Sequence, residues 1–545
     1  MKEKVSAALN FFKQKPLILL AIIILAQVCV IFHYAGKRNN LHTDEVFILD
    51  HIVSNNYGML HKWFNAEGYV PSEQLKDYFK LDKGQRFNYS RVYKESKKDT
   101  PIPPAYNLLI YTLYSVYFSF FDNFSIYPGI IFNVIFFILT NILLYFTSRF
   151  LLDEKSALFP SLLWGFSAGA INCALYLRIY ALAAFFFTAL IYVIFNIIKN
   201  KTNNAKHYIF LLFVVYCGIL THYSFITWLA MVLPILLVWF VINKKWTELL
   251  KSTATAASAF VLSALSYPVM DNLLNSGTGK TAQKHIFNFS VVLENSKLMF
   301  DQYCKSYFGF GAEIAVIITV LLAIFFVIRH MRQKAKQHAA IGVADKRIFA
   351  LITSLSIAFI PFIGQVAQLK IPRYIWPAAP ISIVFFCFML YFLIGKTFSF
   401  TEKSKMIIMT AAIICLVIFG FFNREINFDR LGISNHPHEK TSQFNQQYRD
   451  MAAVCVADGN SRWAITGVLY YLTHMRGSAF VSLDKLNNLN EILSGIDISQ
   501  GFILFISNLP KKPDYGEILN LLKQAGFKGH KHLFGTRYCE AYHIT

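Results

Sequence analysis

The sequence is poor in charged residues, and poorer still in acids. Only 15% of its 545 residues are Asp, Glu, Lys or Arg, whereas a soluble protein carries about a quarter. Hydrophobic residues make up 55% and the mean hydropathy is +0.43. Many apolar runs exceed ~17 residues, enough to cross a bilayer as a helix. This composition excludes an ordinary soluble protein and predicts a polytopic α-helical membrane protein.

Metal and nucleotide motifs are also lacking. No Cys-x-x-Cys or Cys/His cluster has metal-ligand spacing. The stretch Ser276–Thr281 looks like a phosphate-binding loop, but Leu274 stands where that loop needs glycine. No Gly-x-Gly-x-x-Gly fingerprint occurs in the last hundred or so residues. We expect no certain cofactor; a divalent metal stays open but is not indicated.

The basic excess does not point to nucleic acid, although 52 Lys and Arg face 31 acids and give a net charge of +21. The cations fall mostly in short loops between apolar runs, which is typical of cytoplasmic loops. We expect membrane lipids as partners and no nucleic acid. With the N-terminus inside, all lysine-rich loops lie inside if the chain crosses about eleven times. The predicted spans are residues 16–34, 125–147, 157–174, 180–198, 208–220, 224–242, 253–270, 312–328, 348–368, 374–394 and 406–422.

This parity requires that residues 104–121 do not cross the membrane. If they did, the basic loops would all lie outside. We predict an interfacial helix within a first outer loop of residues 35–124. Amphipathic tyrosine rings in this stretch suit the headgroup level; they are Tyr106, Tyr111, Tyr114 and Tyr117.

The sequence divides into a membrane domain, residues 1–428, and a small soluble α/β domain, residues 429–545. In the second part apolar runs shorten to strand length at 462–466, 479–483 and 501–507. They alternate with helical patterns at 468–474, 486–494 and 515–525, which suggests a mainly parallel sheet. Gly526 is placed to end the last helix. Cys455 and Cys539 share this domain, and a disulfide between them is open.

Asp44 and Glu45 form an acid pair just beyond the first span. They lie between Leu41 and the apolar run 46–49. Such surroundings desolvate a carboxylate, raise its pKa and suit it to general-base chemistry. An ordinary loop acid is the competing interpretation.

Other predicted outer ends carry cations and aromatic residues. Arginine binds phosphate through paired N–H groups, although an arginine at a span end also serves as an interface anchor. The candidates for substrate or lipid-phosphate binding are Asp99, Tyr106, Arg178, Tyr180, His222, Tyr223, Arg373 and Tyr374.

Together these motifs resemble the GT-C membrane glycosyltransferases. They are Asp44-Glu45 after the first span, a Pro-Pro-x-Tyr elbow at 103–106, Arg-x-Tyr-Ala-Leu at 178–182, Thr-His-Tyr at 221–223 and Arg-Tyr-x-x-Pro at 373–377. The branch with protein O-mannosyltransferases and lipid A aminoarabinose transferases is the most similar. The resemblance covers residues 10–395.

The resemblance implies transfer of a sugar from a polyprenyl-phosphate donor to a glycan, lipid or protein acceptor. Asp44 would be the base, and Glu45 would orient the acceptor or share that role. Arg178 and Arg373 would hold the leaving phosphate on the opposite face of the sugar, so that the anomeric carbon inverts. The family acts outside the cytoplasm, which implies a bacterial inner or plasma membrane with the active site and the C-terminal domain extracytoplasmic.

The sequence departs from the family at Ile102, where relatives carry histidine. His42 and His222 are candidates to replace it. Two other functions stay open, namely a transporter or flippase for lipid-linked glycans, and a polymerase or ligase. A transporter would place ionisable residues or broken helices near mid-membrane.

An introduced cysteine tests the topology. We expect Asn123→Cys, in a background without native cysteines, to react with an impermeant maleimide on intact cells, because parity places this loop outside. A cysteine introduced at Asn200 should react only after lysis. The reverse pattern would overturn the interfacial helix.

Overall fold

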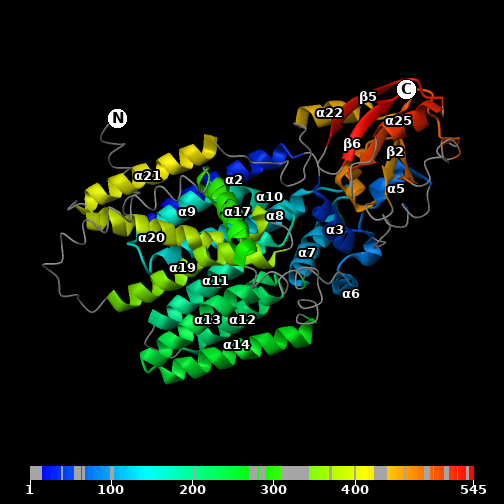
Figure 1. Cartoon of the computed structure of the whole chain (residues 1–545). Helices are drawn as coiled ribbons and strands as arrows, with labels where there is room; N and C mark the ends of the chain where they lie inside the picture. The colour runs from blue at the N-terminus through cyan, green and yellow to red at the C-terminus, as the bar shows by residue number, and fades with distance from the viewer. Residues whose placement is uncertain are drawn as a thin grey trace.

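The fold is seen in a computed structural model of the chain (Figure 1). The residues described are 15–38, 41–54, 63, 68–98, 103–199, 204–268, 280, 289–309, 311, 343–367, 371–397, 401–422, 438–458, 462–483, 491, 493–494, 496–508, 515–524, 526–535 and 539–545.

Within these ranges, six helices are long and apolar enough to span a membrane. They are α2 (Pro16–Gly36), α8 (Tyr127–Ser148), α11 (Tyr180–Lys199), α13 (Ser224–Ile242), α14 (Trp246–Ser266) and α19 (Val343–Val366). Shorter apolar stretches lie in α12 (Ala205–Ile219), α20 (Ala379–Thr397) and α21 (Glu402–Phe422). The polytopic helical fold is confirmed. The count of eleven stays a prediction, since span 312–328 lies outside the described residues.

The third predicted span is two helices, α9 (Leu158–Gly165) and α10 (Ala168–Leu175), bent by 66°. Ser167 causes the new start, because its hydroxyl accepts the N–H of Ala170 at 3.2 Å. The side chain of Gln27 fills the space beside Gly165, where a Cβ would lie 2.3 Å from it. The bend sets where α10 ends, and the turn after α10 reaches the start of α3 (Thr43–Ile52).

The predicted interfacial segment is helix α7 (Ala105–Phe120), but its tyrosines do not lie where we expected. Tyr106, Tyr111 and Tyr114 are fully buried. The hydroxyl of Tyr111 donates to the carbonyl of Gln85, so this ring contacts the preceding loop segment instead of facing headgroups. The exposed large hydrophobic residues of α7 are Leu109, Val116 and Phe120. The interfacial placement itself stays a prediction.

A further difference concerns residues 271–311, which we predicted as a polar loop. They include α17 (Phe289–Phe308), which packs against α19. Met299 and Tyr303 lie on its buried side, and Tyr303 forms a hydrogen bond with Ser382 at 2.6 Å. Polar residues in the same helix lower the hydropathy of the segment, which is why we predicted a loop. Short elements described between the long helices are α5 (Ser72–Asp77), η1 (Lys83–Gln85), α6 (Tyr89–Lys98) and η2 (Pro372–Tyr374).

The C-terminal part forms a six-stranded sheet in the order β1-β3-β2-β4-β6-β5. Among the described strands, only the pairings of β2 with β3 and with β4 are parallel, so the expectation of a mainly parallel sheet is wrong. The elements are β1 (Tyr69–Pro71), α22 (His438–Gln447), β2 (Ala452–Ala457), η3 (Arg462–Val468), α23 (Leu469–Leu472), β3 (Gly477–Ser482), β4 (Phe502–Ser507), α25 (Tyr515–Gln524), β5 (His530–Gly535) and β6 (Cys539–Ile544).

Two other predictions for this domain have clear outcomes. The run 462–466 is a 3-10 helix instead of a strand. A strand lies instead at the alanine-rich segment 452–457, which we missed because its composition gives a weak strand signal. Gly526 has φ +97° after α25, as a helix-ending glycine requires. Cys455 and Cys539 are buried free thiols on strands separated by β4. Most of 486–494 lies outside the described residues.

Strand β1 comes from the first outer loop, far from the other strands in sequence. Tyr69 pairs with Ala479 and Val70 with Ser478, and α5 packs beside them (blue among orange and red in Figure 1). Strands of one sheet lie on one side of a membrane, so the first outer loop and the C-terminal domain share a side. The boundary at 428/429 stays a prediction, and the sheet includes this strand from before it.

A cross-link tests this strand pairing. Tyr69 and Ala479 are a non-hydrogen-bonded antiparallel pair, with Cα atoms about 4.5 Å apart, within the reach of a disulfide. We expect Tyr69→Cys with Ala479→Cys to join the two halves of a protease-cleaved chain on non-reducing gels. Tyr69→Cys with Ser478→Cys should not. Equal cross-linking of the two pairs would contradict the register.

Candidate functional site

The acid pair opens helix α3, whose start is a capping box. His42 is the N-cap, and its Nδ1 accepts the N–H of Asp44 at 2.9 Å. The N–H of His42 donates to Glu45 Oε2 at 2.7 Å. This reciprocal arrangement satisfies two backbone donors at the helix start and turns the two carboxylates in different directions.

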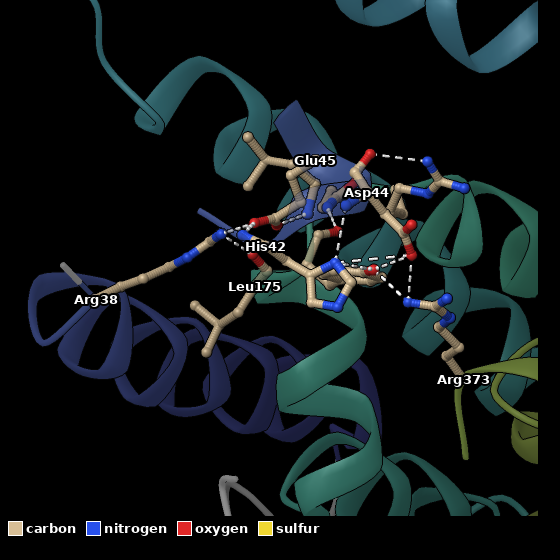
Figure 2. Close-up of polar contacts among 10 residues, drawn as sticks. Arg38, His42, Asp44, Glu45, Leu175 and Arg373 are labelled. Atoms are coloured by element: carbon tan, nitrogen blue, oxygen red, sulfur yellow. Dashed lines mark hydrogen bonds and ion pairs between the residues drawn. The ribbon is translucent and has the colours of Figure 1, made fainter. Parts of the chain in front are cut away.

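Glu45 is turned inward and fully paired. Its side chain and that of Arg38 are both 0% exposed and form an ion pair. Its Oε1 accepts the N–H of Leu177 at 2.7 Å, and Arg38 also donates to the carbonyl of Leu175 at 2.5 Å. Figure 2 shows Glu45 directed toward Arg38, with Leu175 beside them. Glu45 therefore joins the end of α2 to the turn that follows α10.

Asp44 is turned the other way, toward Arg373 (Figure 2). Its Oδ2 lies 2.5 Å from Arg373 Nη1 and accepts the hydroxyl of Tyr176 at 2.9 Å. Arg178 donates to the backbone carbonyl of Asp44 at 2.8 Å. The side chain of Asp44 is 24% exposed, so it is the accessible member of the pair.

The electrostatics of Asp44 are opposite to our expectation. Burial raises the pKa of this carboxyl, but the guanidinium groups of Arg178 and Arg373 outweigh burial and hold the pKa well below its ordinary value. The predicted raised pKa is thus wrong for Asp44, because the expected desolvation is outweighed by two arginines that are distant in sequence but lie beside Asp44 in the fold. Asp44 is ionised throughout the physiological range.

Two histidines stay neutral near the acid. Burial, aided by Arg373 and Arg178 and opposed by the attraction of Asp44, lowers the pKa of His42 to about 3. Burial also lowers the pKa of His222 to about 3, with a smaller effect of Arg178. Nδ1 of His222 accepts the N–H of Ser224 at 3.0 Å. Neither histidine is a cation in the site.

The turn between α10 and α11 brings Tyr176 and Arg178 to Asp44. Its backbone is fixed at successive residues: Glu45 and Arg38 hold Leu177 and Leu175, and Asn133 donates to the carbonyl of Tyr176 at 2.6 Å. Each of these partners is buried. The position of both functional side chains is therefore set by polar contacts to the main chain.

Aromatic rings line the cationic side. Tyr176 stacks on Tyr180 with centroids 6.0 Å apart, and Trp376 meets Tyr180 edge-on at 5.6 Å. His222 and Tyr374 also contact the Tyr180 ring. The predicted residues Arg178, Tyr180, His222, Arg373 and Tyr374 thus meet in one cluster with Asp44.

The remaining predicted residues are Asp99, Tyr106 and Tyr223. Asp99 lies outside the described residues. Tyr106 is buried edge-on against Phe132 at 5.4 Å, and within the described part of the chain no contact links it to Asp44. Tyr223 is half-buried beside the start of α13.

Sequence reasoning missed Arg38, Tyr176 and Trp376. Tyr176 lies two residues before Arg178, and Trp376 three after Arg373, so the neighbourhood of each arginine was the available signal. Arg38 resembles an ordinary cation at a span end, and nothing in the sequence shows that it is buried.

Several donors in this cluster are unused. Among the described residues, Nε of Arg178, Nε of Arg373 and the indole N–H of Trp376 have no hydrogen-bond partner. Buried unpaired donors are rare and call for an explanation, such as an absent ligand. No group of three His, Cys, Asp or Glu that could hold a metal is found in the described ranges.

Neither a family model nor a curated protein matches this chain. The structure is similar to that of ArnT from Cupriavidus metallidurans bound to undecaprenyl phosphate, with TM-score 0.47 and 11% identity over 96% of this chain and 98% of that one. It is also similar to the Archaeoglobus fulgidus oligosaccharyltransferase in the apo form, with TM-score 0.47 and 12% identity over 97% and 74%. The archaeal oligosaccharyltransferase AglB from Archaeoglobus fulgidus, in complex with an inhibitory peptide and a dolichol-phosphate, is similar with TM-score 0.41 and 12% identity, over 96% of this chain and 74% of that one. At these identities the likeness assigns neither an activity nor a site residue to this chain.

The two carboxylates should differ in their effect on stability. Glu45→Gln leaves Arg38 buried without its counter-charge, and breaking a buried pair in this way costs about 3–5 kcal/mol. Asp44→Asn should cost clearly less, because that side chain is partly exposed. Thermal unfolding of the purified variants in one detergent measures the difference. Equal loss in the two variants would contradict the assignment of Glu45 as the structural acid.

Proposed function

We propose that the protein transfers a sugar from a polyprenyl-phosphate donor to a hydroxyl of an acceptor, with inversion at the anomeric carbon. Asp44 is the general base. Arg178 and Arg373 bind the donor phosphate. The observation that carries this proposal is an ionised, partly exposed carboxylate beside two arginines with unused N–H groups.

The division of labour between the acids follows from their contacts. Both oxygens of Glu45 accept hydrogen bonds from fixed donors, and the side chain is 0% exposed. A base must reach the proton that it removes, which Glu45 cannot do without breaking the site. Asp44 is accessible, so Asp44 is the base and Glu45 holds it in place.

The charges support a phosphodiester donor. Glu45 and Arg38 neutralise each other, and the two histidines are neutral. Asp44 with Arg178 and Arg373 leaves a single positive charge, which the single negative charge of a sugar phosphodiester balances. After transfer Asp44 holds the proton, and the doubly charged lipid phosphate faces two arginines. The site is neutral before and after the reaction.

Arg373 has to change partner during this reaction. An inverting displacement requires base and leaving phosphate on opposite faces of the sugar, yet Arg373 Nη1 lies 2.5 Å from Asp44 Oδ2. The donor phosphate competes with Asp44 for this guanidinium. Binding of the donor therefore draws Arg373 away and weakens the interaction that keeps the pKa of Asp44 low, so the carboxylate becomes a stronger base.

We place the site on the extracytoplasmic side. The first outer loop and the C-terminal domain share a sheet, and the distribution of lysines puts that side outside. A soluble domain beside the site suits binding of a glycan, lipid or protein acceptor.

A transporter is the second candidate, because the α9–α10 pair is bent by 66° and broken helices occur in transporters. The break here carries no ionisable side chain, since it runs Gly165-Phe166-Ser167. The bend between α9 and α10 directs the turn with Tyr176 and Arg178 toward Asp44. We therefore favour transfer.

The test is transfer in proteoliposomes, from a set of radiolabelled polyprenyl-phosphate sugars to envelope lipids, glycans and proteins. We expect Asp44→Asn to lower kcat by about 10²–10⁴, the usual contribution of a general base. Binding of free polyprenyl phosphate should persist, because both arginines remain. Arg373→Gln should raise the KM for the donor.

Asp122→Asn is the matched control, since this exposed acid lies at the end of α7 near the same predicted face. It should keep wild-type kinetics. Wild-type kcat in Asp44→Asn would sink the proposal. Movement of labelled lipid across the bilayer without acceptor, equal in wild type and Asp44→Asn, would favour the transporter.

A further inference from the structure

The hydroxyl of Tyr176 lies at the centre of the contacts around Asp44. It is 2.9 Å from Asp44 Oδ2, 3.1 Å from His42 Nδ1 and 2.5 Å from Arg373 Nη1. These three partners come from the cap of α3, from α3 itself and from η2. One phenol therefore joins the acid, the helix cap and the mobile cation of the proposed mechanism.

The direction of each hydrogen bond follows from the valences. Arg373 has only donors, so the phenol oxygen accepts from it. Nδ1 of His42 has one lone pair in the ring plane, and the N–H of Asp44 already uses it at 2.9 Å. The single phenol proton therefore goes to Oδ2 of Asp44.

The ring of Tyr176 has little freedom to leave. The residue is 0% exposed. Tyr180 stacks on one side, Trp376 and His42 meet the ring edge-on, and the Arg373 guanidinium lies 5.5 Å from its centroid. The carbonyl of Tyr176 is held by Asn133. The hydroxyl of Tyr176 is thus a donor with a fixed position, and this position determines the orientation of the Asp44 carboxylate.

The two oxygens of Asp44 are consequently unequal. Oδ2 accepts from Tyr176 and pairs with Arg373, and among the described residues no hydrogen bond or ion pair is formed at Oδ1. We propose that Tyr176 is a positioning residue that ties Oδ2 and turns Oδ1 toward the acceptor, so that Oδ1 is the atom that removes the proton. This rests on the proposed function and assigns its base to one atom.

The step balances as follows. The acceptor O–H proton moves to Oδ1 while the acceptor oxygen bonds to the anomeric carbon. The bond from that carbon to the phosphate oxygen breaks, and its electron pair leaves with the lipid phosphate. Tyr176 keeps its own proton and holds Oδ2 when Arg373 moves to the phosphate. Asp44 afterwards loses the proton to solvent.

Modification by dicyclohexylcarbodiimide reports on Asp44 without any substrate. The reagent attacks the protonated carboxyl, so the rate at fixed pH follows the protonated fraction even far above the pKa. Besides Tyr176, the groups that face Asp44 are Arg178, Arg373 and His42, and Tyr176→Phe leaves all three. We expect this variant to be modified at Asp44 about tenfold faster, by mass spectrometry, since it loses a hydrogen bond to the ionised form.

In the transfer assay, Tyr176→Phe should lower kcat by about tenfold to a hundredfold with the KM for the donor within a few-fold of wild type. A purely structural role would instead lower donor binding and leave the modification rate of Asp44 unchanged. Tyr114→Phe is the matched control: this buried tyrosine of α7 donates to the carbonyl of Ser125 at 3.2 Å, away from Asp44. It should match wild type in both measurements.

A second variant keeps the test valid if Tyr176→Phe does not fold. Replacement of Tyr176 by 3-fluorotyrosine preserves the ring and makes its hydroxyl a stronger donor, so modification of Asp44 should become slower. Wild-type rates and wild-type kcat in both variants would overturn the role of Tyr176. That result leaves Asp44→Asn as the separate test of the base, so the two proposals fail independently.

Discussion

The buried ion pair between Arg38 and Glu45 is the interaction on which the site depends. Two charges with no exposed surface are costly to bury, and only complete pairing makes this tolerable. Glu45 meets the requirement by accepting from Arg38, from the cap of α3 and from Leu177. The same carboxylate thereby fixes the end of the first span against the turn that follows α10. Asp44, Tyr176 and Arg178 owe their relative positions to it.

The two adjacent acids, Asp44 and Glu45, point in different directions and therefore have different surroundings. The first turn of a helix has two faces, and the capping box sends Glu45 back over the helix start while Asp44 points away. Asp44 then lies beside the guanidinium groups of Arg178 and Arg373. Its low pKa makes it a weak base while both arginines stay beside it, so the proposed chemistry requires a ligand that draws one of these cations away. The donor phosphate is the group that would do so.

Much of the membrane architecture could be predicted, because long apolar runs have few alternatives in a bilayer. Such runs fixed the spans from Pro16 to Gly36 and from Tyr180 to Lys199 closely. The break between α9 and α10 was missed, since Gly165 and Ser167 look unremarkable in an apolar run. For the candidate site, residue types at span ends predicted Asp44, Arg178 and Arg373, which the structure brings together. Tyr176 and Arg38 were missed because burial and hydrogen bonding are properties of the fold and leave no local pattern.

The pairing of strand β1 with β3 could not be predicted from any pattern in the sequence. Three residues, Tyr69 to Pro71, are too few for a strand signal, and their partner β3 is distant in the chain. The pairing is nevertheless specific, since Gly477 leaves room for the Tyr69 ring where a Cβ would meet its hydroxyl at 2.2 Å. The C-terminal domain also touches α3 through η3. It is therefore attached at two points, through β1 and through α3, to the segment that carries Asp44. This attachment explains why a soluble domain so distant in sequence contributes to one continuous core with the membrane helices.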